Sequence, residues 1–233
     1  MRDFSSLPCL CRLFRGIPAA DIQSILEHAG ARVTAVKDGG SLFVAGDRAD
    51  RFGVVLSGSL CVVSYKADGR KTIIKRVGPM EVVAAAQAVA RARFTVTVEA
   101  ETQSEVLVLK SAPVVSPPGS GGASHIRLMR NLLEILAEKT LALNGKIGIL
   151  SHRATAERLM DYLEEMAEKA GSREFDIPFD RQGLADFLCV ERSALSSEIG
   201  RLVREGVIKS CKNHFEFPAD ARRPAGAQDA GMV

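Results

Sequence analysis

The chain has 233 residues, of which 46% are hydrophobic, and a formal net charge of +3 at pH 7. This length suits one large or two modest domains with ordinary cores, and so small a charge neither requires nor excludes nucleic acid as a partner. The N-terminus lacks the apolar core and cleavage site of a signal peptide, and no run of about 18 uncharged apolar residues suggests a membrane span. We therefore expect a cytoplasmic protein without a membrane partner.

The cysteines and histidines do not form a recognisable ligand set. The five cysteines are odd in number and scattered, which argues against a disulfide framework. An iron-sulfur cluster needs four thiolates, and only Cys9 and Cys11 lie close together in the sequence. No pair of histidines has the spacing of haem ligands, and a solvated histidine is the commoner outcome. Neither a cluster nor haem is supported, and no metal site is expected.

The first part of the chain reads as a short helix followed by many strands. Residues 12–30 form an amphipathic pattern that begins near Pro18 and stops at Gly30. Residues 31–110 consist of short β-branched runs, and turns recur at Asp38-Gly39, Gly46-Asp47, Ser57-Gly58 and Asp68-Gly69. Strands of this length and spacing predict a small antiparallel barrel or jelly roll. The apolar stretch MEVVAAAQAVARA within it favours a helical turn.

The segment SAPVVSPPGSGGAS, residues 111–124, has three prolines and three glycines in fourteen residues. Because proline removes a backbone donor and disrupts helices and central strands, we expect a flexible surface loop here.

A long helix follows, and it carries two apolar stripes. Its first stripe alternates steps of three and four residues, which is the spacing of a coiled-coil seam and predicts a homodimer. The second stripe, Leu128, Leu132, Ile135 and Leu141, is expected to face the barrel. The predicted dimer interface consists of Ile126, Met129, Leu133, Leu136, Thr140, Leu143, Ile147 and Leu150.

Two short helices and a ribbon occupy residues 180–217, after a break at 151–154 and an amphipathic helix that stops at Gly171. This order is the outline of a winged helix-turn-helix. In the second short helix Leu195, Ile199 and Leu202 form the inner stripe, and the opposite face is rich in serine. Small polar side chains allow close approach to a DNA groove, and Arg192 at the start of the helix can pair with a guanine edge.

The stretch IPFDRQGLADFLCVERSALSSEI followed by KNHF resembles the C-terminal domain of the Crp/Fnr family of bacterial transcription regulators, in a branch common in anaerobic bacteria. The pattern Gly46-Asp47, Asp50, Val55, Ser57-Gly58 resembles the effector domain of the same family. The resemblance covers about residues 12–217. It implies a dimeric protein that binds double-stranded DNA, interacts with RNA polymerase and responds to a small-molecule effector. It implies no enzymatic activity.

The resemblance also implies residue roles. In nucleotide-binding relatives a Gly-Glu pair holds the ribose and an Arg-Ser pair holds the phosphate. Val82-Val83 and Phe94-Thr95 stand in those places here. A ribose diol without an acceptor loses a main source of specificity, so cyclic AMP is not expected. The candidate effector pocket is Val82, Val83, Arg91, Arg93, Thr95, Leu143 and Asn144. The candidate DNA contacts are Arg181, Gln182, Arg192, Ser193, Ser196, Ser197, Lys209, Lys212 and His214.

The predicted fold class is thus α+β, in four parts. Residues 1–123 form a β-roll (jelly-roll) effector domain, 124–151 a dimerisation helix, 152–217 a winged helix-turn-helix and 218–233 a disordered tail. Two alternatives stay open: a haem- or redox-sensing regulator of the same fold, and a cupin-like metal enzyme. The enzyme would need clustered histidine and carboxylate ligands on barrel strands, and residues 31–110 contain no histidine.

Overall fold

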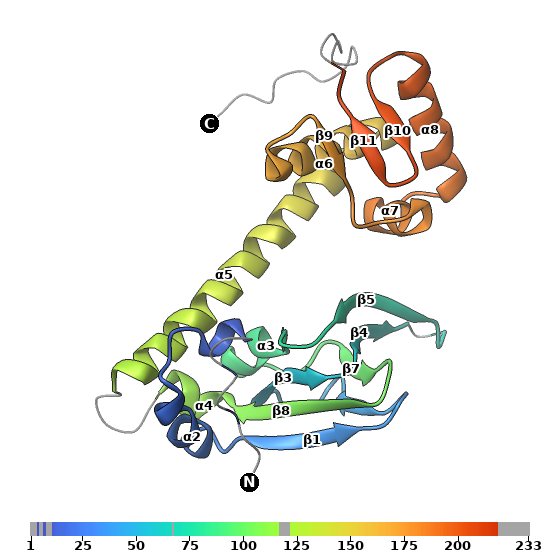
Figure 1. Cartoon of the computed structure of the whole chain (residues 1–233). Coiled ribbons are helices and arrows are strands. Elements are labelled where there is room, and N and C mark those ends of the chain that lie inside the picture. The colour runs from blue at the N-terminus through green and yellow to red at the C-terminus, as the bar shows by residue number, and fades with distance from the viewer. Residues whose placement is uncertain (1–3, 5–6, 8–10, 67, 117–121, 219–233) are drawn as a thin grey trace. The chain divides into compact units, whose positions relative to one another are not determined.

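The structure, a computed structural model, describes residues 4, 7, 11–66, 68–116 and 122–218. The chain divides into two compact units, Met1–Lys139 and Thr140–Val233, and each is described by itself. Helix α5 (Ala123–Ser151) begins in the first unit and ends in the second (Figure 1). Cys9 and the predicted disordered tail, apart from Pro218, lie outside the described residues.

The first unit is built on two four-stranded antiparallel sheets. One has the order β1-β8-β3-β6 and the other β2-β7-β4-β5. Buried residues of both sheets, such as Val55 and Val106 on one and Leu60 and Val98 on the other, form a shared core. The predicted jelly-roll pattern is confirmed. The strands are β1 (Arg32–Val36), β2 (Ser41–Phe43), β3 (Arg51–Ser57), β4 (Leu60–Tyr65), β5 (Lys71–Val77), β6 (Val82–Val83), β7 (Thr97–Ala100) and β8 (Ser104–Lys110).

Glycines make the expected turns with positive φ, and Gly58 shows why. Its φ is +82°, and a Cβ atom there would lie 2.5 Å from the carbonyl oxygen of Gln103. Gly39 has a similar φ of +73° but open space around it. The β3–β4 turn therefore needs glycine for room as well as for backbone freedom.

Helices cover the outer face of the β1-β8-β3-β6 sheet. Residues of η1 (Arg12–Phe14), α2 (Ala19–His28) and α5 pack with Phe52, Val54, Leu107 and Leu109 in a second core. The expected helical turn is confirmed as α3 (Ala85–Val89). The expectation of no helix after Lys110 is wrong for its first residues, because α4 (Ser111–Val115) forms there and buries Ser111 and Val114. Its one proline, Pro113, sits in the first turn, where a missing N–H costs little.

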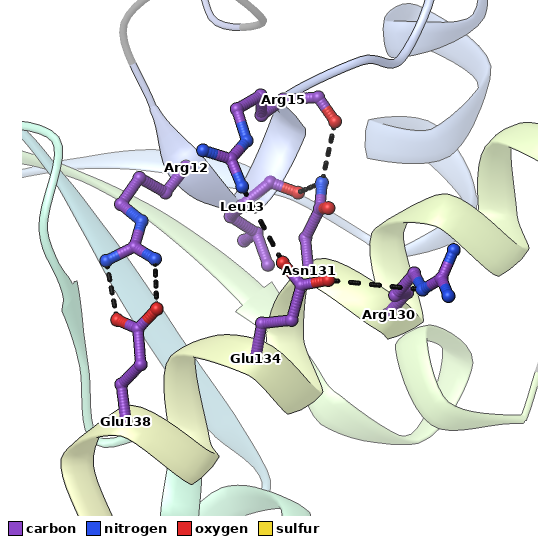
Figure 2. Close-up of polar contacts among 7 residues, drawn as sticks. All are labelled: Arg12, Leu13, Arg15, Arg130, Asn131, Glu134 and Glu138. Atoms are coloured by element: carbon purple, nitrogen blue, oxygen red, sulfur yellow. Dashed lines mark hydrogen bonds and ion pairs between the residues drawn. The ribbon is translucent and has the colours of Figure 1, made fainter.

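The N-terminal segment is fastened to α5 by a buried amide and exposed ion pairs (Figure 2). Asn131, 4% exposed, donates to the carbonyl oxygens of Leu13 (2.9 Å) and Arg15 (2.8 Å). Arg12 pairs with Glu138 at the surface. Because buried carbonyl groups need donors, the asparagine contributes more to this junction than the exposed pair.

The two stripes of α5 differ in exposure. Leu128, Leu132 and Ile135 are buried in the helix-covered core, as expected. Leu141, the last residue of this stripe, belongs to the second unit and is 69% exposed. The second stripe therefore crosses the boundary between the two units, which lies after Lys139. In the first stripe Ile126, Leu133, Leu143 and Ile147 are each at least 60% exposed.

The second unit holds a helix, a helix pair and a small antiparallel sheet. The elements are α6 (Thr155–Ala170), β9 (Glu174–Asp176), α7 (Arg181–Leu188), α8 (Arg192–Arg204), β10 (Lys209–Cys211) and β11 (His214–Glu216), and the sheet order is β10-β11-β9. Leu159, Leu163, Leu184, Leu195 and Phe215 lie in one core. The α+β class, the long helix and the winged helix-turn-helix are confirmed.

Candidate nucleic-acid interface

Helix α7 has a capped start, and a short turn joins it to α8. The side chain of Asp180 accepts a hydrogen bond from the backbone N–H of Gly183 (2.7 Å) and so caps α7. Cys189 ends α7 in the left-handed region, with φ 54° and ψ 47°, and α8 begins three residues later. Leu184, Ala185 and Leu188 of α7 and Leu195, Ile199 and Leu202 of α8 are buried, as the sequence pattern predicts.

The serine-rich face of α8 is open to solvent. Arg192, Ser193, Ser196 and Ser197 are all exposed. Arg192 is the first residue of the helix, where the macrodipole is already positive. A cation at this place is unfavourable in the free protein and becomes favourable when an anion approaches the helix start.

An open cleft of about 810 Å³ lies in front of the helix pair. Four of the predicted DNA-contact residues line it: Arg181, Gln182, Arg192 and Lys212. Sequence reasoning missed Phe179 and Asn213, which also line the cleft. Asn213 follows Lys212 in the β10–β11 turn and donates to the carbonyl oxygen of Ile177 (3.3 Å), so it ties the wing to the segment between β9 and α7. The signal for Asn213 was its place beside Lys212 in the KNHF segment.

Arg181 is held by the wing on one side and lacks a partner on the other. One terminal nitrogen, Nη2, donates to the Ser210 hydroxyl (2.6 Å), and the guanidinium lies 5.2 Å from the Phe215 ring centroid. The second terminal nitrogen, Nη1, is buried with no hydrogen-bond partner among the described residues. Burial lowers the pKa of Arg181, which reflects the cost of keeping the charge there. Arg181 also lines the cleft, where its positive charge can attract an incoming anionic oxygen.

Three of the predicted contacts, Gln182, Lys209 and His214, are engaged with side chains of the protein itself. Lys209 pairs with Glu216 (2.8 Å), and Gln182 donates to Asp186 (2.8 Å). His214 contacts Asp176 (3.0 Å) and Glu174 (3.2 Å), and its hydrogen bond with Asp176 raises the pKa of the imidazole, with further help from the charge of Glu174. In the described part of the chain, by contrast, neither Arg192 nor Lys212 has an ion-pair partner. Arg192 and Lys212 therefore keep uncompensated positive charge at the cleft.

The break between α5 and α6 is fastened to the helix pair. His152 contacts the carboxylate of Asp161 (2.6 Å). Arg158 donates to the carbonyl oxygens of His152 (2.8 Å) and Leu188 (3.0 Å), the latter at the end of α7. A movement at this break would thus be transmitted to the helix pair through hydrogen bonds.

The candidate effector residues are spread over different surroundings. Val82 and Val83 are buried in the two cores, and the Lys139 ammonium group donates to the Val82 carbonyl oxygen (2.7 Å). Arg91 and Thr95 are exposed, and Arg93 donates to the carbonyl oxygen of Gly46 (2.6 Å). Leu143 and Asn144 are exposed on the part of α5 that belongs to the second unit.

Other kinds of site would need reactive cysteines, metal-ligating side chains or long apolar helices. Cys11 and Cys61 are buried, and Cys189 and Cys211 are exposed, all with free thiols. Within the described ranges no group of three or more His, Cys, Asp or Glu side chains could hold a metal ion. Over the same ranges, no helix combines the length and the apolar character needed to span a bilayer.

Comparison with solved structures shows the same fold in three bacterial regulators. The Thermus thermophilus catabolite activator protein is 18% identical, covers 89% of this chain and 93% of its own, and has a TM-score of 0.52. The c-di-GMP responsive global regulator CLP of Xanthomonas campestris is 17% identical, covers 85% and 98%, and has a TM-score of 0.55. FixK2 from Bradyrhizobium japonicum is 17% identical, covers 80% and 92%, and has a TM-score of 0.50. No curated protein sequence matches the chain.

Two family models match the sequence, one for each unit. Residues 33–115 match the cyclic nucleotide-binding domain, and residues 157–218 match the Crp-like helix-turn-helix domain. Together they account for more than half of the chain, in the order that the structure shows. The chain therefore belongs to the Crp/Fnr family of transcription regulators.

Proposed function

We propose that this protein is a homodimeric, sequence-specific DNA-binding regulator that recognises a near-palindromic site and acts in the cytoplasm as a binding protein, not as an enzyme. The observation that carries the proposal is the cleft in front of α7 and α8, where Arg181, Arg192 and Lys212 converge. A cleft lined by cations beside an exposed helix face of serines suits a duplex, which offers phosphate oxygens and base edges together.

The roles within this surface follow from the contacts. Arg192, Ser193, Ser196 and Ser197 lie on the exposed face of α8 and would read bases or the nearest phosphates. At the start of α7 and in the wing turn, Arg181, Gln182 and Lys212 would contact the phosphate backbone of the DNA. Lys209 and His214 would add weaker backbone contacts, because each is already paired with a carboxylate.

The exposed seam of α5 supports the dimer. Ile126, Leu133, Leu143 and Ile147 are large apolar side chains at heptad spacing that the chain itself leaves uncovered. A second copy would cover them. Two copies would then present two α8 helices to successive major grooves, roughly 34 Å apart on B-DNA.

The effector that controls this dimer would differ from a cyclic nucleotide. Val82 and Val83 are buried where relatives carry the ribose-binding pair, and neither offers a carboxylate to a ribose diol. An effector that prefers one dimer arrangement would shift the population of DNA-competent molecules, with RNA polymerase as the downstream partner.

The decisive experiment is a binding-site selection with the full chain and two arginine variants. We expect Arg192→Ala to relax sequence preference at one position of each half-site by about 1 to 3 kcal/mol. Arg204→Ala is the matched control, because Arg204 is an exposed arginine at the opposite end of the same helix, about 18 Å away. An unchanged preference in Arg192→Ala, or an equal loss in both variants, would contradict the proposed reading face.

A further inference from the structure

A small basic pocket lies on the first unit, at one end of the β1-β8-β3-β6 sheet. Its volume is about 130 Å³, and we refer to it as the basic pocket. Neither the DNA-binding surface nor the candidate effector residues account for it. Its lining consists of Gly30, Arg32, Thr34, Arg51, Val108 and Lys110.

Strand register explains why these residues meet. Arg32 of β1 pairs with Val108 of β8, and Lys110, two residues further along β8, pairs with Arg51 of β3. Residues that pair, or that are two apart on one strand, share a face of the sheet. Three cationic side chains from three adjacent strands therefore project from the same face. It is the face that carries Val55 and Val106 into the core between the sheets.

Backbone contacts hold this end of the sheet together. The N–H of Lys110 donates to the carbonyl oxygen of Ala29, and the N–H of Ser111 donates to that of Asp50, both at 2.9 Å. Gly30 has no side chain, and a Cβ atom there would lie 3.3 Å from Cδ of Lys110. The lysine stem thus lies along a glycine, and its position depends on that glycine.

The charges in the pocket are poorly compensated. Lys110 and Arg51 stand directly opposite each other, and like charges in that position destabilise a sheet. Asp50 lies 3.4 Å from Arg51, and both side chains are more than half exposed, so this pair is weak. Within the described residues, Arg32 and Lys110 have no ion-pair partner. A bound anion would turn an unfavourable cluster of cations into a favourable one.

We propose that the basic pocket binds the phosphate group of a small molecule. Two arginines can each offer paired N–H donors to a tetrahedral oxyanion, which suits phosphate better than a single carboxylate. Lys110 adds a compact positive charge, and the Thr34 hydroxyl adds a neutral donor. A volume of about 130 Å³ is enough for a phosphate group and leaves the remainder of a phosphomonoester outside. This site is separate from the DNA-binding surface and does not depend on it.

The test is a titration of the full chain with inorganic phosphate and with glycerol phosphate, at constant ionic strength, followed by calorimetry and by amide NMR shifts. We expect saturable binding of both probes, with shifts confined to residues around Gly30, Arg32, Arg51 and Lys110. The variant Arg32→Gln with Lys110→Met should weaken binding by about tenfold or more, since it removes two of the three cations that line the pocket. Lys37→Met, an exposed lysine just beyond the far end of β1, is the matched control and should bind within about twofold of the parent protein.

Several results would overturn the proposal. Binding of acetate as tight as that of phosphate, at equal ionic strength, would refute selectivity for phosphate. Binding of polyglutamate without binding of phosphate would indicate an acidic protein partner instead. Equal losses in the double variant and in Lys37→Met would show non-specific attraction to positive charge. If the double variant fails to fold, the NMR shifts of the parent protein decide: shifts absent from the pocket refute the site. Binding of inorganic phosphate but not of glycerol phosphate would refute a phosphomonoester ligand.

Discussion

Replacing Arg181 with methionine separates stability from DNA binding. The substitution keeps an unbranched apolar stem and removes the guanidinium. In the free protein that guanidinium makes one hydrogen bond, to Ser210, and one ring contact, with Phe215, and it leaves Nη1 buried without a partner. The variant therefore loses two favourable interactions and one unfavourable one.

The magnitudes nearly cancel in the free protein. The charged hydrogen bond contributes about 1.5 to 3 kcal/mol and the ring contact about 0.5 to 1 kcal/mol. The unsatisfied donor costs about 1 to 3 kcal/mol, and burial of the charge, seen in the lowered pKa of Arg181, adds to that cost. We expect Arg181→Met to change the free energy of unfolding by about 1 kcal/mol or less. In the homodimer the substitution removes one phosphate contact from each half-site, so it should weaken DNA binding by about tenfold per half-site and reduce the salt slope by about 2.

Two assays on the same variant check this reasoning. Urea unfolding followed by circular dichroism measures stability, and fluorescence anisotropy with a selected duplex, over a range of salt concentrations, measures DNA binding. Arg204→Met serves as the control for removal of one positive charge from the same unit. A stability loss above about 3 kcal/mol with an unchanged salt slope would show that Arg181 only braces the wing, and the reasoning would be refuted.

Three further predictions concern the exposed seam of α5, the β3–β4 turn and the wing. Leu143→Glu should convert the dimer to a monomer, as measured by light scattering. Leu141→Glu is the control and should leave the dimer intact, because Leu141 is similarly exposed (69% against 62%) but lies outside the heptad seam. A dimer that survives Leu143→Glu rules out this interface. Gly58→Ala should lower the free energy of unfolding by more than Gly39→Ala does. Left-handed backbone strain of about 1 to 2 kcal/mol applies to both positions, but only at Gly58 would the new Cβ atom clash with the Gln103 carbonyl oxygen. Equal decreases in the free energy of unfolding, measured with urea, would contradict this clash. Because Asp176 first, and then Glu174, raise the pKa of His214 above its ordinary 6.5, the protonated imidazole stabilises the wing fully below pH 6.5, and this contribution is lost as the pH rises through the folded value. His214→Gln should therefore unfold at lower urea than the parent protein at about pH 5.5 and match it at about pH 8.5, and a constant difference would refute the linkage.

Part of the fold was predictable because it rests on short-range patterns. Val55, Leu60 and Val98 lie in β-branched runs between glycine turns, and these runs became the sheets of the roll. Leu195, Ile199 and Leu202 recur at helical spacing and became the inner face of α8. Such patterns work because the periods of strand and helix are local properties of the backbone.

Predictions failed where an outcome depended on neighbours distant in the chain. Residues 111–115 form α4 although they include a proline. Val114 is buried in the core, and Pro113 lies in the first turn of the helix, where a missing N–H group costs little. Along α5, the inner stripe is buried at Leu128, Leu132 and Ile135 and exposed at Leu141, which belongs to the second unit. Helical spacing identifies a stripe, but it does not say how far along the helix a partner surface extends.

Residue type and spacing were sufficient to identify the strands, the helix pair and the exposed face of α8, which begins with Arg192. They were not sufficient to say which cations are free. Lys209 and His214 face carboxylates across the wing, Arg181 keeps an unpaired nitrogen, and Arg32, Arg51 and Lys110 meet from three strands. The reason is physical: a charge is neutralised or exposed by strand register and by the residues across from it, and these are settled only when distant segments pack together.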